Sequence, residues 1–305
     1  MARASRPWCP SASSGAHHGR DARATFMIDF CAMTRHLSKR PLVVIVVLLL
    51  CGLRGDAQVP KELSKAESEA KAEQIITRAI EVLGGPKYLN VSTLIGRGLF
   101  TPFQEGASGI PVKFVDYIVY PDKERTEFTG AAVRSIQVNV GDTGWIFDGM
   151  VKTLNDQKPE QIADFKFGLK TNLEHLLHGS WRTEGATVSY IGRREAGLAK
   201  RNETLRLTYP DGFWIEYEFG ARDGLPAKIL YIRKHKNPDT FEMEEGIEED
   251  WLAKPIAIDG VTAPWVIDHY IVGKQSSRIT YESIDYNKPV PDTLFTKPAT
   301  IKGLK

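Results

Sequence analysis

The sequence predicts a mainly β protein of the α+β class, in which two helices lie across the concave, apolar face of one long, curved antiparallel sheet. Three observations favour this fold class. Short segments with strand-like alternation follow one another at regular spacing, turn motifs separate them, and only two segments have the periodicity of amphipathic helices. Strands joined by such short turns pair antiparallel, because parallel neighbours need long crossover connections.

The first 57 residues have the pattern of an export signal, and we expect them to lie outside the folded domain. Residues 42–50 read LVVIVVLLL, with basic residues before them and small residues leading up to Ala57. This apolar run is too short for a membrane span, which needs about 20 residues. We expect cleavage near Ala57, export to the periplasm, and one mature domain over residues 58–305. A lipid attachment site needs a small residue directly before the cysteine, whereas Cys51 follows three leucines. A lipid anchor at Cys51 is therefore disfavoured.

Charge and cysteine usage exclude several classes of function. Of the 40 basic residues, eight lie in residues 1–57, so residues 58–305 keep 32 basic and 35 acidic residues and a net charge of −3. A nucleic-acid-binding domain needs a basic surface, which this balance does not provide. All three cysteines precede residue 58. The main body therefore has no disulfide framework, thiol nucleophile or cysteine-based metal site.

The first predicted helix spans residues 61–83. Its alanine, isoleucine and leucine residues recur on one stripe, and Gly84-Gly85-Pro86 provides a stop signal. A second amphipathic helix is predicted over residues 160–178, where apolar residues recur at intervals of three and four, with Gly179 as its end.

Strand candidates fill the rest of the chain. Turn motifs such as Pro210-Asp211-Gly212 separate them. The predicted strands cover residues 92–102, 112–120, 123–129, 133–140, 143–148, 150–154, 187–194, 203–209, 213–219, 226–235, 240–252, 256–259, 264–272 and 277–286.

Alternation within these strands predicts one dry and one solvated face of the sheet. In one strand, Ile215, Tyr217 and Phe219 share a face, whereas Glu216 and Glu218 occupy the other. This pattern is typical of a sheet that is covered on one side only.

Few residues suggest catalysis. The chain has no GxSxG, HExxH, P-loop or GxGxxG motif. Glu174, His175 and His178 have a spacing that a metal site could use, but polar residues at a helix end are the commoner reading, because the helix dipole favours imidazolium there. The acidic run of residues 242–250 could supply paired carboxylates, although such a run is more often a solvated strand. No metal and no cofactor is predicted.

Three stretches resemble the periplasmic outer-membrane lipoprotein-sorting (LolA/LolB-like) family. Residues 117–128 resemble its strand–Pro–strand hairpin. Residues 138–148 resemble its hairpin with glycine and tryptophan in fixed register, and residues 259–298 resemble its C-terminal ending. The resemblance implies an unclosed antiparallel barrel with helices as a lid over an apolar cavity. It also implies a non-enzymatic protein that holds a lipid or the acyl chain of a lipoprotein. Dedicated carriers have an arginine directly before the hairpin proline, whereas this chain has Tyr120 at that position. This difference argues against lipoprotein shuttling.

The ligand-binding residues expected from this interpretation are large apolar side chains from the sheet and the second helix. They are Trp145, Phe147, Phe165, Leu169, Leu173, Leu205, Leu207, Ile215, Tyr217 and Phe219. The same side chains could equally fill a core. Two other classes stay open: an envelope protein-interaction or stress-sensor domain of the same fold, and a secreted hydrolase.

Overall fold

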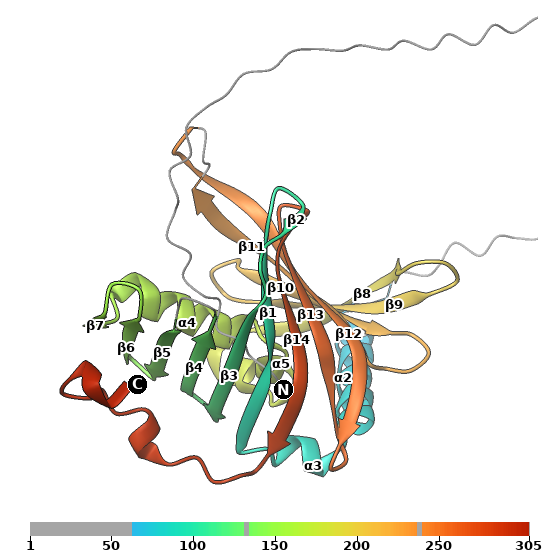
Figure 1. Ribbon diagram of the computed structural model, residues 1–305. Coiled ribbons are helices and arrows are strands. Elements are labelled where there is room, and N and C mark those ends of the chain that lie inside the picture. Colours follow the sequence, from blue (N-terminus) through green and yellow to red (C-terminus); the bar gives the residue numbers. More distant parts are fainter. Residues whose placement is uncertain (1–62, 131–133, 237–239, 305) are drawn as a thin grey trace, which may run out of the picture. The chain divides into compact units, whose positions relative to one another are not determined.

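A computed structural model describes residues 63–130, 134–236 and 240–304. The predicted signal and cleavage site lie outside these residues. The described chain forms one antiparallel sheet of 14 strands that does not close, and the sheet curves strongly, with helices on its concave side (Figure 1). The mainly β class, the curved sheet and the antiparallel pairing predicted from the sequence are confirmed. None of the helices within the described residues has the length and apolarity needed to cross a membrane.

The sheet consists of two up-and-down series of strands that meet in its middle. The strand order is β7-β6-β5-β4-β3-β1-β14-β13-β12-β11-β10-β9-β8, and β2 pairs with β1. The first long strand thus pairs with the last one. The strands are β1 (Thr93–Gln104), β2 (Ala107–Ser108), β3 (Val112–Val119), β4 (Lys123–Thr129), β5 (Arg134–Val140), β6 (Thr143–Asp148), β7 (Thr153–Asp156), β8 (Thr187–Glu195), β9 (Arg201–Thr208), β10 (Trp214–Gly220), β11 (Pro226–Lys236), β12 (Met243–Ile258), β13 (Val261–Ile271) and β14 (Lys274–Tyr286).

Apart from shifts of a few residues at strand ends, the observed strands differ from the predicted ones in two places. The predicted strands 240–252 and 256–259 are one strand, β12, since residue 255 still pairs with Pro264 of β13. The short strand β2 was not predicted, because two residues carry no alternation to detect.

The first helix, α2 (Lys65–Leu83), begins four residues later than the sequence suggested. Ser64 caps it: its hydroxyl accepts a hydrogen bond from the backbone N–H of Glu67, and the Glu67 carboxylate accepts one from the backbone N–H of Ser64. Such a capping box satisfies backbone donors that a helix start leaves free. The helix ends at Gly84, whose φ of 126° suits glycine. The short helix α3 (Pro86–Leu89) follows.

The second predicted helix is two helices, α4 (Pro159–Thr171) and α5 (Leu173–Leu177). The break lies at Asn172, which has an extended backbone and accepts a hydrogen bond from the His175 N–H at 2.8 Å. Asparagine is a strong N-cap, so it starts a new helix where periodicity alone predicts continuation. A 3-10 helix, η1 (Ser180–Glu184), follows α5.

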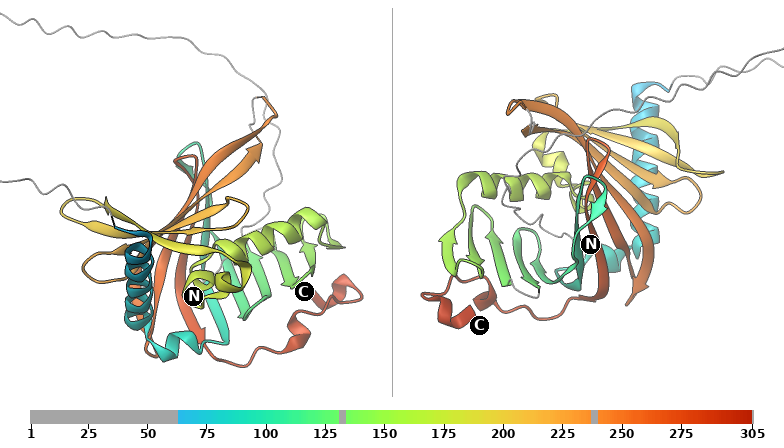
Figure 2. Two further views of the ribbon diagram at one scale, coloured as in Figure 1. Left: turned by 180° about the vertical axis from the view of Figure 1, so that it is seen from behind. Right: turned by 45° about the horizontal axis from the view of Figure 1, so that its top comes forward.

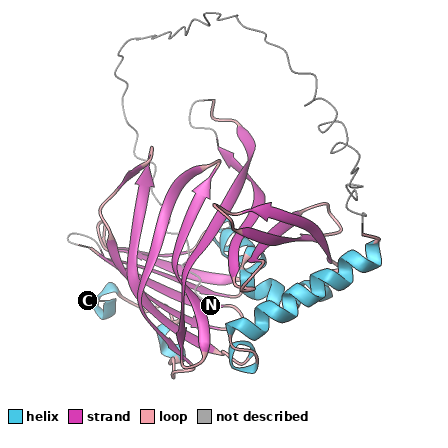
Figure 3. Cartoon of the chain, turned by 90° about the vertical axis from the view of Figure 1, so that its right-hand side faces the viewer, coloured by secondary structure: helices cyan, strands magenta, loops and turns pink. Residues whose placement is uncertain are grey.

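The main hydrophobic core lies between the sheet and the helices α2 and α5. Figure 3 shows α2 lying against one end of the sheet. Its buried stripe consists of Ala72, Ile75, Ile76, Ala79 and Leu83, which pack into the same cluster as the buried residues of α5 and of the second half of the sheet. Such burial is the main source of stability of the fold.

A second, smaller cluster lies on the other side of the sheet, under the C-terminal segment. The short 3-10 helices η2 (Asp292–Leu294) and η3 (Ile301–Leu304) belong to this segment. Phe295 and Leu304 pack there against Ile136, Val138 and neighbouring side chains of β5 and β6. The strands β3–β6 therefore have α4 on one side and the C-terminal segment on the other (Figures 1 and 2).

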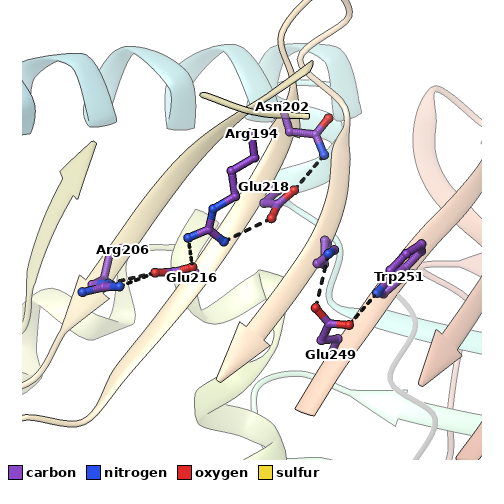
Figure 4. A network of polar contacts seen from close by, with 8 residues as sticks. Arg194, Asn202, Arg206, Glu216, Glu218, Glu249 and Trp251 are labelled. Atoms are coloured by element: carbon purple, nitrogen blue, oxygen red, sulfur yellow. Dashed lines mark hydrogen bonds and ion pairs between the residues drawn. The ribbon is translucent and has the colours of Figure 1, made fainter. Parts of the chain in front are cut away.

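The prediction that Glu216 and Glu218 of β10 face solvent is wrong. Glu216 is only 2% exposed and Glu218 only 4%. Arg206 Nε lies 2.9 Å from Glu216 Oε1, and Arg194, on β8, contacts both carboxylates (Figure 4). Long arginine side chains cover these glutamates and bind them, so paired charges are buried where alternation predicts solvent.

Candidate functional site

The helix α4 bridges the two halves of the curved sheet on its concave side (Figure 2). On one side, Lys166 forms an ion pair with Asp142 in the turn between β5 and β6. On the other side, Asp164 forms an ion pair with Arg233 of β11. These largely exposed pairs contribute little stability each, and they link α4 to both halves of the sheet.

Apolar side chains are buried or half-buried on two sides of α4. Phe165 is buried, and Leu169 is half-buried. The ring of Phe167 meets Tyr231 edge-on at a centroid distance of 5.4 Å and lies 5.7 Å from Phe213. The helix therefore presents aromatic and aliphatic side chains toward the sheet.

The concave face of β1, β3 and β4 carries further aromatic side chains, which belong to the main core. Phe100 and Phe128 lie edge to face at 5.8 Å, and Phe114 meets Tyr281 of β14 at 5.5 Å. Ile118 is buried beside them in the main cluster. Aromatic pairs in this geometry add to the energy of area burial.

Buried polar side chains interrupt this apolar face. Asp116 and Thr126 are fully buried, and the Thr126 hydroxyl donates to Asp116 at 2.7 Å. Glu124 is also buried on the same face of β4. Burial, reinforced by the negative charges of Asp116 and Glu124, raises the pKa of the Tyr281 hydroxyl well above its ordinary value. The concave face of β3 and β4 is thus apolar with an acidic portion. The sequence analysis did not predict this portion, although Asp116 interrupts the apolar alternation of β3.

A cluster of histidines and carboxylates lies on β11, β12 and β13. Tyr231 donates a hydrogen bond to the buried Glu248 at 2.9 Å, and His235 Nε2 lies 3.2 Å from the same carboxylate. His269 lies 3.6 Å from Glu248 and contacts Asp250 through Nδ1 at 2.6 Å. The sequence reading placed Glu248 and Asp250 in a solvated run. It missed the cluster because the histidines come from two other strands.

The structure separates the ten predicted ligand-binding residues. One group belongs to the main core, where α2 and α5 cover it: Leu173, Leu205, Leu207, Ile215, Tyr217 and Phe219. The Tyr217 hydroxyl donates to the Asn172 carbonyl at 3.2 Å, and burial raises its pKa well above the ordinary value. These side chains make intramolecular packing contacts with the helices.

Two predicted residues face the opposite side of the sheet. Trp145 and Phe147 are buried in the second cluster, and the Trp145 indole N–H donates to the Phe295 carbonyl at 2.9 Å. Only Phe165 and Leu169 lie on α4 itself. The predicted residues therefore do not share one surface, because alternation shows which side chains share a strand face but not which layer covers that face.

His175 and His178, whose spacing a metal site could use, contact different partners. His175 Nε2 lies 2.9 Å from the Tyr209 hydroxyl and 3.4 Å from Glu184, whereas the His178 ring packs near Tyr88. Burial lowers the pKa of His178 despite the nearby charge of Glu174. No group of three or more histidine, cysteine or carboxylate side chains among the described residues is arranged to hold a metal ion.

Comparison with known proteins gives structural neighbours only. No protein-family model matches the chain, and no curated protein matches it. A DUF1329 family protein from Desulfovibrio piger is 10% identical, with a TM-score of 0.49, over 74% of this chain and 97% of that chain. A LolA superfamily protein from Nitrosomonas europaea is 14% identical, with a TM-score of 0.47, over 74% of this chain and 97% of that chain.

An uncharacterized conserved protein from Thermus thermophilus is 10% identical, with a TM-score of 0.34, over 75% of this chain and 95% of that chain. At such identities and TM-scores, these similarities support no inference about ligand or activity. The family that the sequence motifs resemble, the LolA superfamily, is nevertheless found among the structural neighbours of this protein.

Proposed function

We propose that this is an exported, non-enzymatic binding protein of the periplasm that holds a lipid or the acyl chain of a lipoprotein under α4. The observation that carries the proposal is the position of α4. This amphipathic helix spans the open side of an unclosed sheet, turns Phe165 inward, and is tied at its edges by the ion pairs of Lys166 and Asp164. Concave faces roofed by a helix are common ligand sites.

The energetics of this proposal are those of apolar burial. Each buried methylene contributes about 0.8 kcal/mol, so roughly eight methylenes contribute about 6 kcal/mol before the costs of binding are subtracted. The acyl chain would lie against Phe165 and Leu169 of α4 and against the sheet beneath them. The carboxylates of Asp116 and Glu124 disfavour an anionic headgroup at depth, so the headgroup of the ligand would remain at the opening.

A substitution on α4 tests the proposal. Leu169→Glu places a charge on the half-buried side of α4, and we expect lipid retention to be lost while the sheet stays folded. Ala163→Glu is the matched control, because Ala163 is exposed on the same helix. Native mass spectrometry after mild extraction from the periplasm reports the bound species, and circular dichroism checks the fold. Equal lipid retention in both variants would count against a site under α4.

A protein-interaction domain of the same fold is the second candidate. Met243, Ile247 and Val272 are exposed where β12 meets the turn between β13 and β14, and the Val272 N–H donates to the Ile247 carbonyl at 2.8 Å. Exposed apolar patches often mark interaction surfaces. Under this alternative, native mass spectrometry of the extracted protein detects a bound protein and no lipid.

A further inference from the structure

A cleft lined by arginines lies where the β8–β9 hairpin meets the turn between β10 and β11. Its volume is about 430 Å³. The strand β9 pairs with β10 up to Gly220, so the two chain reversals lie side by side. The lining residues are Arg193, Glu195, Ala199, Arg201, Ala221 and Arg222. Three positive charges and one negative charge therefore face this space.

The partners of these arginines leave the cleft positively charged. Arg201 Nε contacts Glu195 at 3.0 Å, and Arg193 contacts the carboxylate of Glu203 at 2.8 Å. Each guanidinium has five N–H groups, so one carboxylate does not exhaust it. Arg222 lines the cleft as well, and its carbonyl accepts a hydrogen bond from Arg78 of α2.

Positive charges outnumber negative ones around the cleft. Lys200 lies in the turn of the β8–β9 hairpin, and Asp223, which follows Arg222, is the acid of the neighbouring turn. The Asp223 carboxylate accepts the Leu225 N–H within its own turn. Residues 58–305 have a net charge of −3, so this cationic end contrasts with the rest of the protein.

An apolar side chain projects next to this cleft. Leu198, at the tip of the β8–β9 hairpin, is 98% exposed, more than any other large apolar residue among those described. Gly197 (φ 115°) and Ala199 (φ 56°) flank it with left-handed backbone, which makes the reversal tight. The hairpin extends beyond the neighbouring strands (Figures 1 and 2).

The hairpin is held to the rest of the fold. The Ser68 hydroxyl of α2 donates to the Tyr190 carbonyl and accepts from the Tyr190 N–H, both at 2.9 Å, at the outer edge of β8. The Tyr190 hydroxyl donates to Glu203 at 2.7 Å, and burial together with this bond raises its pKa to about 12. These bonds fix the base of the hairpin, and the exposed tip projects from it.

We propose that this end of the protein docks on a membrane surface that contains anionic lipids. Leu198 would enter the boundary between headgroups and acyl chains, and the arginines of the cleft with Lys200 would contact lipid phosphates. Apolar tips flanked by cations bind reversibly to such surfaces, since apolar burial and electrostatic attraction add. The proposal is independent of the ligand under α4, because it uses none of the same residues.

Vesicle sedimentation tests the proposal with the mature protein from residue 58 onward, because the apolar run of residues 42–50 and the basic residues before it would themselves bind anionic vesicles. We expect binding to vesicles of phosphatidylglycerol and phosphatidylcholine that is strong at low salt and weakens as salt rises. Leu198→Asp should weaken binding at least tenfold, because it replaces apolar burial by a charge repelled by the surface. Arg222→Ala should weaken it about fivefold, which corresponds to about 1 kcal/mol for one cation near an anionic surface.

Two matched variants make the result specific. Ile110→Asp removes another highly exposed apolar residue, 85% exposed, from the loop between β2 and β3, and should leave vesicle binding unchanged. Ala163→Glu adds a negative charge at an exposed position of α4 outside the cleft, and it should also leave vesicle binding unchanged. Equal losses in Leu198→Asp and Ile110→Asp, equal binding to purely phosphatidylcholine vesicles, or no binding to protein-free vesicles would each overturn the proposal.

Discussion

The buried ion pairs of β10 provide the sharpest test of how this sheet is held together. Glu216 contacts Arg206 of β9 and Arg194 of β8, so one carboxylate joins three strands (Figure 4). Glu216→Gln keeps the shape of the side chain and removes its charge. The amide then turns N–H groups toward guanidinium donors, and both arginines lose a charged partner.

The expected cost follows from burial. Removing one partner of a fully buried ion pair costs about 3–5 kcal/mol. Both arginine side chains are 40% exposed, so water can solvate them when the carboxylate is lost. We therefore expect the free energy of unfolding to fall by about 2 kcal/mol.

Urea unfolding followed by tryptophan fluorescence measures this change. Glu195→Gln is the control, because the Glu195 side chain is 71% exposed and pairs with Arg201 in the same hairpin, so its loss should cost under about 0.5 kcal/mol. Indistinguishable stabilities of the two variants would refute the reasoning that the β10 carboxylates are buried and paired.

Two more substitutions test other parts of the fold. Trp145→Phe removes the indole bond to the Phe295 carbonyl and leaves a gap, so we expect a loss of about 1–2 kcal/mol and faster proteolysis of the C-terminal segment; unchanged proteolysis would contradict this role. Glu203 is buried, which opposes ionisation, but bonds from Arg193 and Tyr190 outweigh this and lower its pKa below the ordinary 4.5. Its contribution to stability is therefore complete above pH 4.5 and lost as the pH falls through the folded-state pKa. Urea unfolding at pH 7 and pH 3.5 should show a smaller acid-induced loss in Glu203→Gln than in the wild type, and equal losses would show that the carboxylate is not stabilised.

Much of the secondary structure was predictable because its signals are local. Turn motifs and alternation gave β4 and β6 at their observed bounds, and Gly84 marked the end of α2. The helix break at Asn172 was missed because apolar periodicity continues across it, and only the N-cap shows the interruption.

The candidate site was less predictable, because it depends on which layer covers each face. Trp145 and Leu205 have similar alternation, yet one lies under the C-terminal segment and the other under α2 and α5. Glu248 and His269 come from different strands, and only the register of β12 with β13 brings them together.

The sequence by itself determined the class of the fold, because strand periodicity, turn residues and helix signals act over a few neighbouring residues. It also determined that the main body has no cysteine chemistry, because composition alone shows this. Only the tertiary structure decided that Glu216 is buried, that Trp145 faces away from α4, and that Leu198 projects beside an arginine-lined cleft. Burial, ion pairing and exposure depend on segments far apart in the chain, and their positions follow from the packing of the whole sheet.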